Sequence, residues 1–114
     1  MGYSFPKTHR LLKRSQFLKL SRSGKKSGTR CFLAIFRQGE AGNNRIGITV
    51  SKKVGKAVVR NRIKRVVREY YRNRKKTIPG NRDINIIAKK NADALTFNEV
   101  TAELDRLFEK ITRV

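Results

Sequence analysis

The sequence has few cysteines and few acidic residues, and the shortage of cysteine excludes certain kinds of site. Its 114 residues include one cysteine, no tryptophan and only 8 Asp and Glu against 29 Lys and Arg. A single cysteine excludes an internal disulfide and a metal site built from several cysteines, and it fits a reducing compartment. We interpret Cys31 as a small, buried strand residue.

Long apolar runs are also missing. No stretch approaches the roughly 20 apolar residues that a membrane-spanning helix needs. The N-terminus, MGYSFPKTHRLL, lacks the continuous apolar segment of a secretory signal. We therefore expect a protein that makes no membrane contact and resides in the cytoplasm.

Residue sets for catalysis are missing as well. His9 is the only histidine, and it has no acidic residue within twenty positions on either side. The sequence contains no Ser/His/Asp set, no paired carboxylates, no nucleotide-binding glycine loop and no metal-ligand spacing. We predict that the polypeptide carries no catalytic residue and no metal site of its own.

What the sequence has in excess is positive charge, with a net charge of +21 and an isoelectric point near 11.3. This exceeds what solubility requires and indicates a polyanionic partner, most simply a nucleic acid. Residues 51–76 carry twelve basic residues and one acid, whereas the last 16 residues hold half of all the acids. One side of the molecule should face the polyanion, and the C-terminal segment should lie away from it.

Periodicity predicts a mixed α+β fold in a single RNA-binding domain over residues 1–114, with residues 1–10 as a flexible basic tail. We expect a short helix with Ser15 as its N-cap and Gly24 at its end, and a C-terminal helix with a capping box formed by Thr96 and Glu99. A basic helix should cover residues 56–72. Strands are expected over residues 30–38, 45–51 and 83–90.

The second of these strands, RIGITVS, alternates between two kinds of side chain. Its apolar residues fall on one face, and Gly47, Thr49 and Ser51 fall on the other. The latter face should be small and open.

The basic helix has one apolar stripe and is otherwise cationic. At about 100° per residue, a single arc holds Val59, Ile63, Val66, Val67 and Tyr70. Asn61, Arg65, Arg68 and Arg72 point the opposite way, with Arg60 and Arg62 on the two shoulders of the stripe. Exposed helices usually mix both signs of charge, so this helix is better suited to bind phosphate groups than only to face solvent.

The aromatic residues allow two interpretations, core packing or stacking on bases. Core packing is the simpler interpretation for most of them, namely Phe32, Phe36, Tyr70 and Tyr71. Phe17 is the best candidate for stacking, because it lies on a short helix among Lys13, Arg14, Lys19 and Arg22.

The segment SKKVGKAVVRNRIKRVVRE, residues 51–69, resembles the signature of the bacterial ribonuclease P protein component. That signature is an Arg-Asn-Arg run in a basic helix that follows a Ser-Lys-Lys loop. The similarity extends over essentially the whole chain. It implies a small, mostly antiparallel sheet sandwiched with helices in the order αβββαβα, and a left-handed βαβ crossover that the general rule would not predict.

The resemblance also implies a function: a subunit of the endoribonuclease that matures the 5′ end of tRNA. The catalytic RNA subunit would bind Mg²⁺ and perform the hydrolysis, and the protein alone would be inactive. The partners would be the catalytic RNA and the 5′ leader of precursor tRNA. Contacts with the catalytic RNA would come from Arg60, Asn61, Arg62, Lys64, Arg65 and Arg68. Contacts with the leader would come from Phe17, Leu33, Ile35, Lys52, Lys53, Lys89 and Lys90.

One departure from the family concerns further aromatic residues in the leader cleft. Family members often carry a second aromatic one helical turn after the Phe17 position and another on the first strand. Here those places hold Ser21 and either Leu33 or Ile35. We therefore expect less stacking, with more of the leader held by charge and apolar contact.

Two other interpretations compete with this one. A ribosomal or ribosome-assembly RNA-binding protein would fit the size, charge and fold class equally well, and only the Arg-Asn-Arg helix with its Ser-Lys-Lys loop argues against it. A DNA-binding module would need a recognition helix within a helix pair, or a dimer seam, and the sequence indicates neither.

Overall fold

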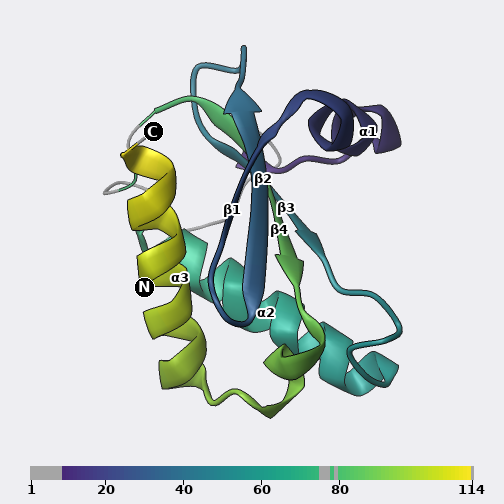
Figure 1. Ribbon diagram of the computed structural model, residues 1–114. Helices are drawn as coiled ribbons and strands as arrows, with labels where there is room; N and C mark the ends of the chain where they lie inside the picture. The colour runs from purple at the N-terminus through teal and green to yellow at the C-terminus, as the bar shows by residue number, and fades with distance from the viewer. Residues whose placement is uncertain (1–8, 75–77, 79, 114) are drawn as a thin grey trace.

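The computed structural model describes residues 9–74, 78 and 80–113 (Figure 1). Three α-helices, four strands and one 3₁₀ helix follow one another in the predicted αβββαβα order. Their bounds are α1 Arg14–Ser23, β1 Lys25–Gly28, β2 Phe32–Gln38, β3 Arg45–Thr49, α2 Ala57–Arg74, β4 Arg82–Ala88, the 3₁₀ helix η2 Lys90–Ala94, and α3 Phe97–Thr112.

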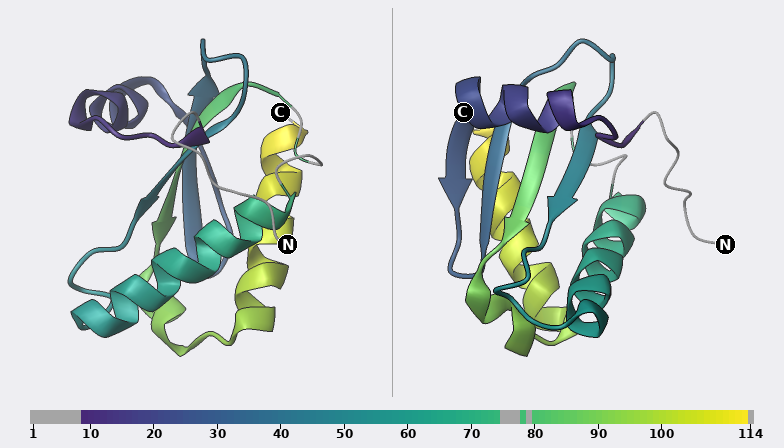
Figure 2. Two further views of the ribbon diagram at one scale, coloured as in Figure 1. Left: turned by 180° about the vertical axis from the view of Figure 1, so that it is seen from behind. Right: turned by 90° about the vertical axis from the view of Figure 1, so that its right-hand side faces the viewer.

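The four strands form one sheet in the order β1-β2-β4-β3. Neighbours are antiparallel except β3 and β4, which are parallel and are joined through α2. In the right-hand view of Figure 2, α1 lies in front of the sheet, α3 lies behind it, and β4 lies to the left of β3. Helix α2 packs into the same core as α3, on the face opposite α1. Since both strands run downward in that view, the crossover is left-handed, and the α+β class is confirmed.

The two faces of the sheet carry different layers. The main core lies on the face covered by α2 and α3, where the alternating residues of β2 and β4 point inward, as in Phe32, Ala34, Ile84 and Ile86. A smaller cluster of Leu11, Leu20 and Ile35 lies under α1 on the other face. Because α1 is short, it covers only one end of that second face (Figure 2).

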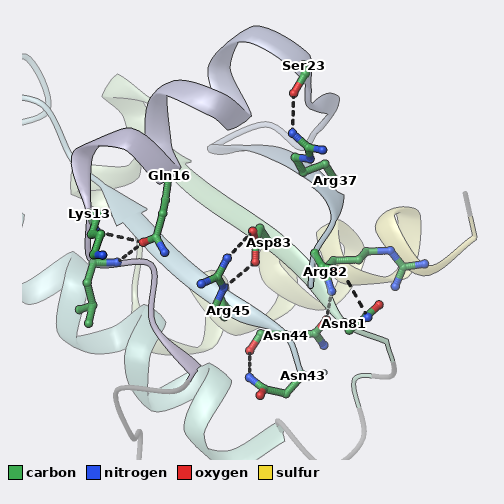
Figure 3. Close-up of polar contacts among 12 residues, drawn as sticks. Lys13, Gln16, Ser23, Arg37, Asn43, Asn44, Arg45, Asn81, Arg82 and Asp83 are labelled. Atoms are coloured by element: carbon green, nitrogen blue, oxygen red, sulfur yellow. Dashed lines mark hydrogen bonds and ion pairs between the residues drawn. The ribbon is translucent and has the colours of Figure 1, made fainter. Parts of the chain in front are cut away.

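Helix α1 begins earlier than predicted. Its N-cap is Lys13, not Ser15. The side-chain oxygen Oε1 of Gln16 accepts hydrogen bonds from the backbone N–H groups of Leu12 and Lys13, at 2.8 and 2.9 Å, so a glutamine in the first turn bonds back to the residues at the start of the helix (Figure 3). The predicted end at Gly24 is confirmed, and its N–H donates to the carbonyl of Leu20.

Two further differences concern the N-terminal half. Strand β1 has the sequence KKSG and contains no apolar side chain. Hydrophobic periodicity therefore could not predict its position. The predicted basic tail falls mostly outside the described residues. Its last part contacts the domain, because Arg10 forms a β-bridge with Ile46 and His9 Nδ1 lies 3.0 Å from the hydroxyl of Tyr71.

The apolar stripe of α2 is shifted by about one residue from the predicted arc. Ile63, Val67 and Tyr70 are buried as expected, but Tyr71 is buried as well, and Val66 is only half-buried. Burial raises the pKa of Tyr71 to about 12. Burial and a hydrogen bond to Asp105 raise the pKa of Tyr70.

Helix α3 confirms its predicted capping box, and it also buries one charge. Thr96 accepts from the N–H of Glu99, and Glu99 accepts from the N–H of Thr96. Glu103 is buried on the inner side of α3, where it accepts hydrogen bonds from Thr29 Oγ1 and the N–H of Cys31. Its own burial opposes ionisation, but these bonds and Arg106 outweigh that cost and lower its pKa.

Candidate nucleic-acid interface

The outward side of α2 presents basic residues without acidic partners. Asn61, Arg65 and Arg68 are exposed, and Lys64 is half-buried. Within the described part of the chain, none of Lys64, Arg65 and Arg68 takes part in an ion pair, whereas Glu69 is occupied by Arg72 at 2.5 Å. Uncompensated like charges along one helix destabilise it, so this face is suited to an added polyanion.

The two arginines of the Arg-Asn-Arg run differ from their exposed neighbours. Arg62 turns back onto the protein, where its Nη1 donates to the carbonyl of Leu95 and its Nη2 to that of Asp93, at 3.2 and 2.8 Å. Arg60 is half-buried, and its Nε is buried without a hydrogen-bond partner among the described residues. Helical spacing predicted that both arginines lie on exposed sides of the apolar stripe. It did not predict η2, which covers the side of α2 that carries Arg62.

Lys64 and Arg68 share a groove with Phe17. This groove holds about 210 Å³ between the N-terminal segment, β3 and α2. It is lined by Arg10, Leu11, Leu12, Phe17, Ile46, Gly47, Ile48, Lys64 and Arg68. Two residues predicted to contact the catalytic RNA thus lie beside the residue predicted to contact the leader. We name this cavity the Phe17 groove.

A second, strongly basic hollow lies next to the Phe17 groove. It holds about 250 Å³ and is lined by Arg10, Arg65, Arg68, Glu69 and Arg72. Arg10 and Arg68 line both cavities, so the two cavities adjoin each other between the N-terminal segment and α2. Arg10 was not predicted as a site residue because it was assigned to the flexible tail, and only the bridge to Ile46 shows its place.

Beyond α1, the sheet leaves an open strip on the same face as Phe17. Leu33 pairs with Ile87, and Thr49 pairs with Ile87 from the other side. Thr49 is exposed and the other two are half-buried. Leu33 and Ile35 lie on this same face, but Ile35 is only 7% exposed under α1. Of the two, Leu33 is therefore the one that an extended strand could touch.

The predicted lysines gather at the far end of this strip from α1. Thr49 and Ile87 are register partners in parallel strands, so Lys52 and Lys53 after β3 and Lys89 and Lys90 after β4 follow at the same sheet end. All four are exposed. Lys89 Nζ also donates to the carbonyl of Thr29 at 2.6 Å. The predicted leader residues therefore form two groups, Phe17 at one end and the lysines at the other.

Under α1 the sheet face is fixed by an ion pair. Arg45 on β3 and Asp83 on β4 are register partners, and their side chains form two hydrogen bonds of 2.8 and 2.7 Å (Figure 3). These bonds to Asp83 raise the pKa of Arg45. Beside them, Arg37 Nη1 donates to the hydroxyl of Ser23 at the end of α1. The Arg37–Ser23 bond joins the end of α1 to β2, and the apolar cluster of Leu20 with Leu11 and Ile35, against which Phe17 packs, holds the rest of the helix on the sheet.

The remaining expectations concern cysteine, metals and membranes. Cys31 is buried at 3% exposure, as predicted, but it lies directly before β2 and not within a strand. Burial and the neighbouring Glu103 raise the pKa of its thiol. Among residues 9–74, 78 and 80–113, no group of three or more His, Cys, Asp or Glu side chains could hold a metal ion. A search of the same residues finds no helix of the length and apolar character needed to cross a membrane.

Comparison with known proteins gives one consistent result. The family model for Ribonuclease P matches residues 5–112. A ribonuclease P protein component from Desulforapulum autotrophicum is 61% identical over 98% of this chain and 96% of that protein. The solved RNase P protein of Staphylococcus aureus has a TM-score of 0.84 at 32% identity, covering 93% of this chain and 96% of the other. That of Thermotoga maritima has a TM-score of 0.82 at 35% identity, covering 89% and 96%. Neither a ribosomal nor a ribosome-assembly role gains support.

Proposed function

Because this chain belongs to the Ribonuclease P family, and so is a protein subunit of the endoribonuclease that matures the 5′ end of tRNA, we propose that α2 docks on the catalytic RNA while the Phe17 groove and the open sheet strip hold the leader of precursor tRNA. The docking residues are Arg60, Asn61, Lys64, Arg65 and Arg68. Arg62 is not among them, because its guanidinium group faces the protein.

The observation that carries this proposal is that the Phe17 groove adjoins the basic hollow on α2, with Arg10 and Arg68 lining both. An extended single strand needs an apolar or aromatic surface for its bases and cations for its phosphates. The groove offers the ring of Phe17 beside Lys64 and Arg68, and the strip continues it past Leu33 and Ile87. Lys52, Lys53, Lys89 and Lys90 would meet the phosphates at the far end. The whole enzyme would work in the cytoplasm, where precursor tRNA is made.

The catalytic chemistry would belong to the RNA. The Mg²⁺ ions that the family implies do not fit a site on the described residues, because the acids there are scattered and several are already engaged. Arg45 holds Asp83, and Arg106 holds Glu103. The protein would contribute by neutralising phosphates and fixing the leader, which lowers the cost of bringing two polyanions together.

A reconstitution experiment tests the proposal. Protein alone, catalytic RNA alone and the two together are incubated with precursor tRNA and Mg²⁺ at moderate salt. We expect cleavage at the mature 5′ end to depend on the RNA and to be accelerated by the protein. Specific cleavage by nuclease-free protein without RNA would contradict the assignment of chemistry to the RNA.

A separate measurement addresses the leader. The affinity of the protein–RNA complex is compared for precursor tRNA and for mature tRNA, with wild type and Lys52→Ala/Lys53→Ala. We expect the wild-type complex to prefer the precursor and the variant to lose part of that preference. An equal loss for both ligands would place Lys52 and Lys53 outside the leader path.

A further inference from the structure

Arg62 belongs to the Arg-Asn-Arg run, yet its guanidinium group faces the protein. It joins the middle of α2 to the end of η2 through the carbonyls of Asp93 and Leu95. The side chain is half-buried. Both acceptors are backbone groups at the C-terminal end of a short helix, where carbonyls lack partners within the helix and a cation is favoured.

An arginine suits this place better than a lysine. Its planar fork directs N–H groups from two nitrogens at once, whereas the ammonium of lysine is a single point on a flexible chain. The two acceptors belong to residues two positions apart, and each is met by a different nitrogen of Arg62. A lysine would keep the charge and would satisfy one carbonyl at most in the same way.

The N-terminal end of η2 is anchored to the loop before β2, because the N–H of Lys89 donates to the carbonyl of Cys31 at 2.8 Å and Lys89 Nζ donates to that of Thr29. The C-terminal end of η2 is the part that Arg62 holds. Helix η2 spans five residues and has no side-chain hydrogen bond at its N-cap, Lys89. Its main apolar anchor is Ala92, which is buried at 1% exposure. On the other side, Asn91 Nδ2 donates to the carbonyl of Arg30 at 3.3 Å. Arg62 therefore joins α2 to η2 by side-chain hydrogen bonds, and Asn91 joins η2 to Arg30 in the loop before β2.

Lys89 is the N-cap of η2 and Lys90 is its first residue, so both lie at the N-terminal end of the helix that Arg62 holds. From these contacts we propose that Arg62 is a positioning residue: it holds η2 against α2 and thereby sets Lys89 and Lys90 at the end of the open sheet strip. The effect on RNA rests on the function proposed above, whereas the hold on η2 does not. Arg65, exposed one turn further along the helix, binds phosphate directly.

Hydrogen exchange on the free protein tests the hold on η2. The amides of Ala92 and Leu95 report on η2, since they donate to the carbonyls of Lys89 and Ala92. Arg62→Lys is expected to lower their protection about tenfold or more, as the loss of a charge-assisted hydrogen bond predicts. The matched variant Arg65→Lys leaves them unchanged. Unchanged protection in Arg62→Lys overturns the proposal. If Arg62→Ala fails to fold, the lysine variant still decides the matter.

Leader binding tests the second step. We expect Arg62→Lys to reduce the preference for precursor over mature tRNA about as much as Lys89→Ala/Lys90→Ala does, and to add nothing in that double-variant background. A purely phosphate-binding Arg62 would instead give additive losses, which would overturn the positioning role. If Lys89→Ala/Lys90→Ala reduces the preference but Arg62→Lys does not, the second step is overturned, and the exchange result still reports on η2.

Discussion

The ring of Phe17 lies directly over the backbone of Gly47, in the space that a side chain would fill. A Cβ atom added at Gly47 would stand 2.7 Å from Cζ of that ring, and closer still to Cε1. Phe17 is thus half-buried against β3 and half-open to the Phe17 groove. The two interpretations of this residue, core packing and base stacking, are compatible because each applies to a different part of the ring.

Gly47→Ala should therefore act on the leader through Phe17. The added methyl group must displace the ring, because the contact is shorter than side chains tolerate. We expect a lower affinity for precursor tRNA and a modest loss of stability, on the order of 1 to 3 kcal/mol as for overpacked sites. The control is Gly47→Ala in a Phe17→Ala background, where the added methyl group has no ring to displace. An equal loss of precursor affinity from Gly47→Ala in both backgrounds would contradict the role of the Phe17–Gly47 contact.

Phe17→Leu separates stacking from packing. Leucine keeps an apolar side chain against Gly47 and Leu11 but removes the aromatic face. If the ring stacks on a leader base, affinity for precursor tRNA should fall by roughly 1 to 3 kcal/mol, with mature tRNA affinity nearly unchanged. Thermal unfolding is measured alongside. A lower melting temperature with equal losses for the two RNAs would assign Phe17 to the core alone.

The free protein should respond to the kind of anion present. With a net charge of +21, self-repulsion weakens the fold at low ionic strength. Sulfate should raise the melting temperature more than chloride at matched ionic strength, because it can accept several hydrogen bonds in the hollow lined by Arg65, Arg68 and Arg72. Arg65→Ala/Arg68→Ala should reduce the difference. Equal melting temperatures in the two salts would leave screening as a sufficient explanation.

Alkaline pH should unfold the protein partly through Tyr71. Its pKa in the folded state is raised from an ordinary value of 10.0 to about 12 by burial. A raised folded-state pKa means that the stabilisation is complete below pH 10 and is lost as pH rises toward 12. Denaturant midpoints at pH 8, 10 and 11.5 should fall more steeply for wild type than for Tyr71→Phe. Parallel declines would contradict the assignment to Tyr71.

The sequence predicted the helices and strands that have strong local patterns. It did not predict features that depend on contacts between different helices and strands. The alternation in β3 and β4 and the capping box at Thr96 predicted their structures correctly, because these signals are local. Strand β1 could not be placed because it is an edge strand without apolar residues. The handedness of the crossover came from the family resemblance, since periodicity carries no such information.

The sequence predicted several residues of the candidate site but not how those residues are arranged in space. The exposure of Arg65 and Arg68 follows from helical spacing alone. The inward turn of Arg62 depends on η2, a helix too short to leave a periodic signal. The position of the Phe17 ring depends on Gly47, which has no side chain to displace it. A glycine within an alternating strand was the only feature of the sequence that indicated close packing of another residue on the backbone there.

Site-directed cross-linking is the measurement that tests the central claim most directly. Cys31 is buried and is replaced by alanine, and a photo-cross-linker is attached to a new cysteine at Thr49 on the strip, at Arg65 on α2, or at Glu109 on α3, all exposed positions. In the assembled complex with precursor tRNA, we predict leader cross-links from Thr49→Cys, catalytic RNA cross-links from Arg65→Cys, and neither from Glu109→Cys. Leader cross-links from α3, with none from the strip, would contradict the account.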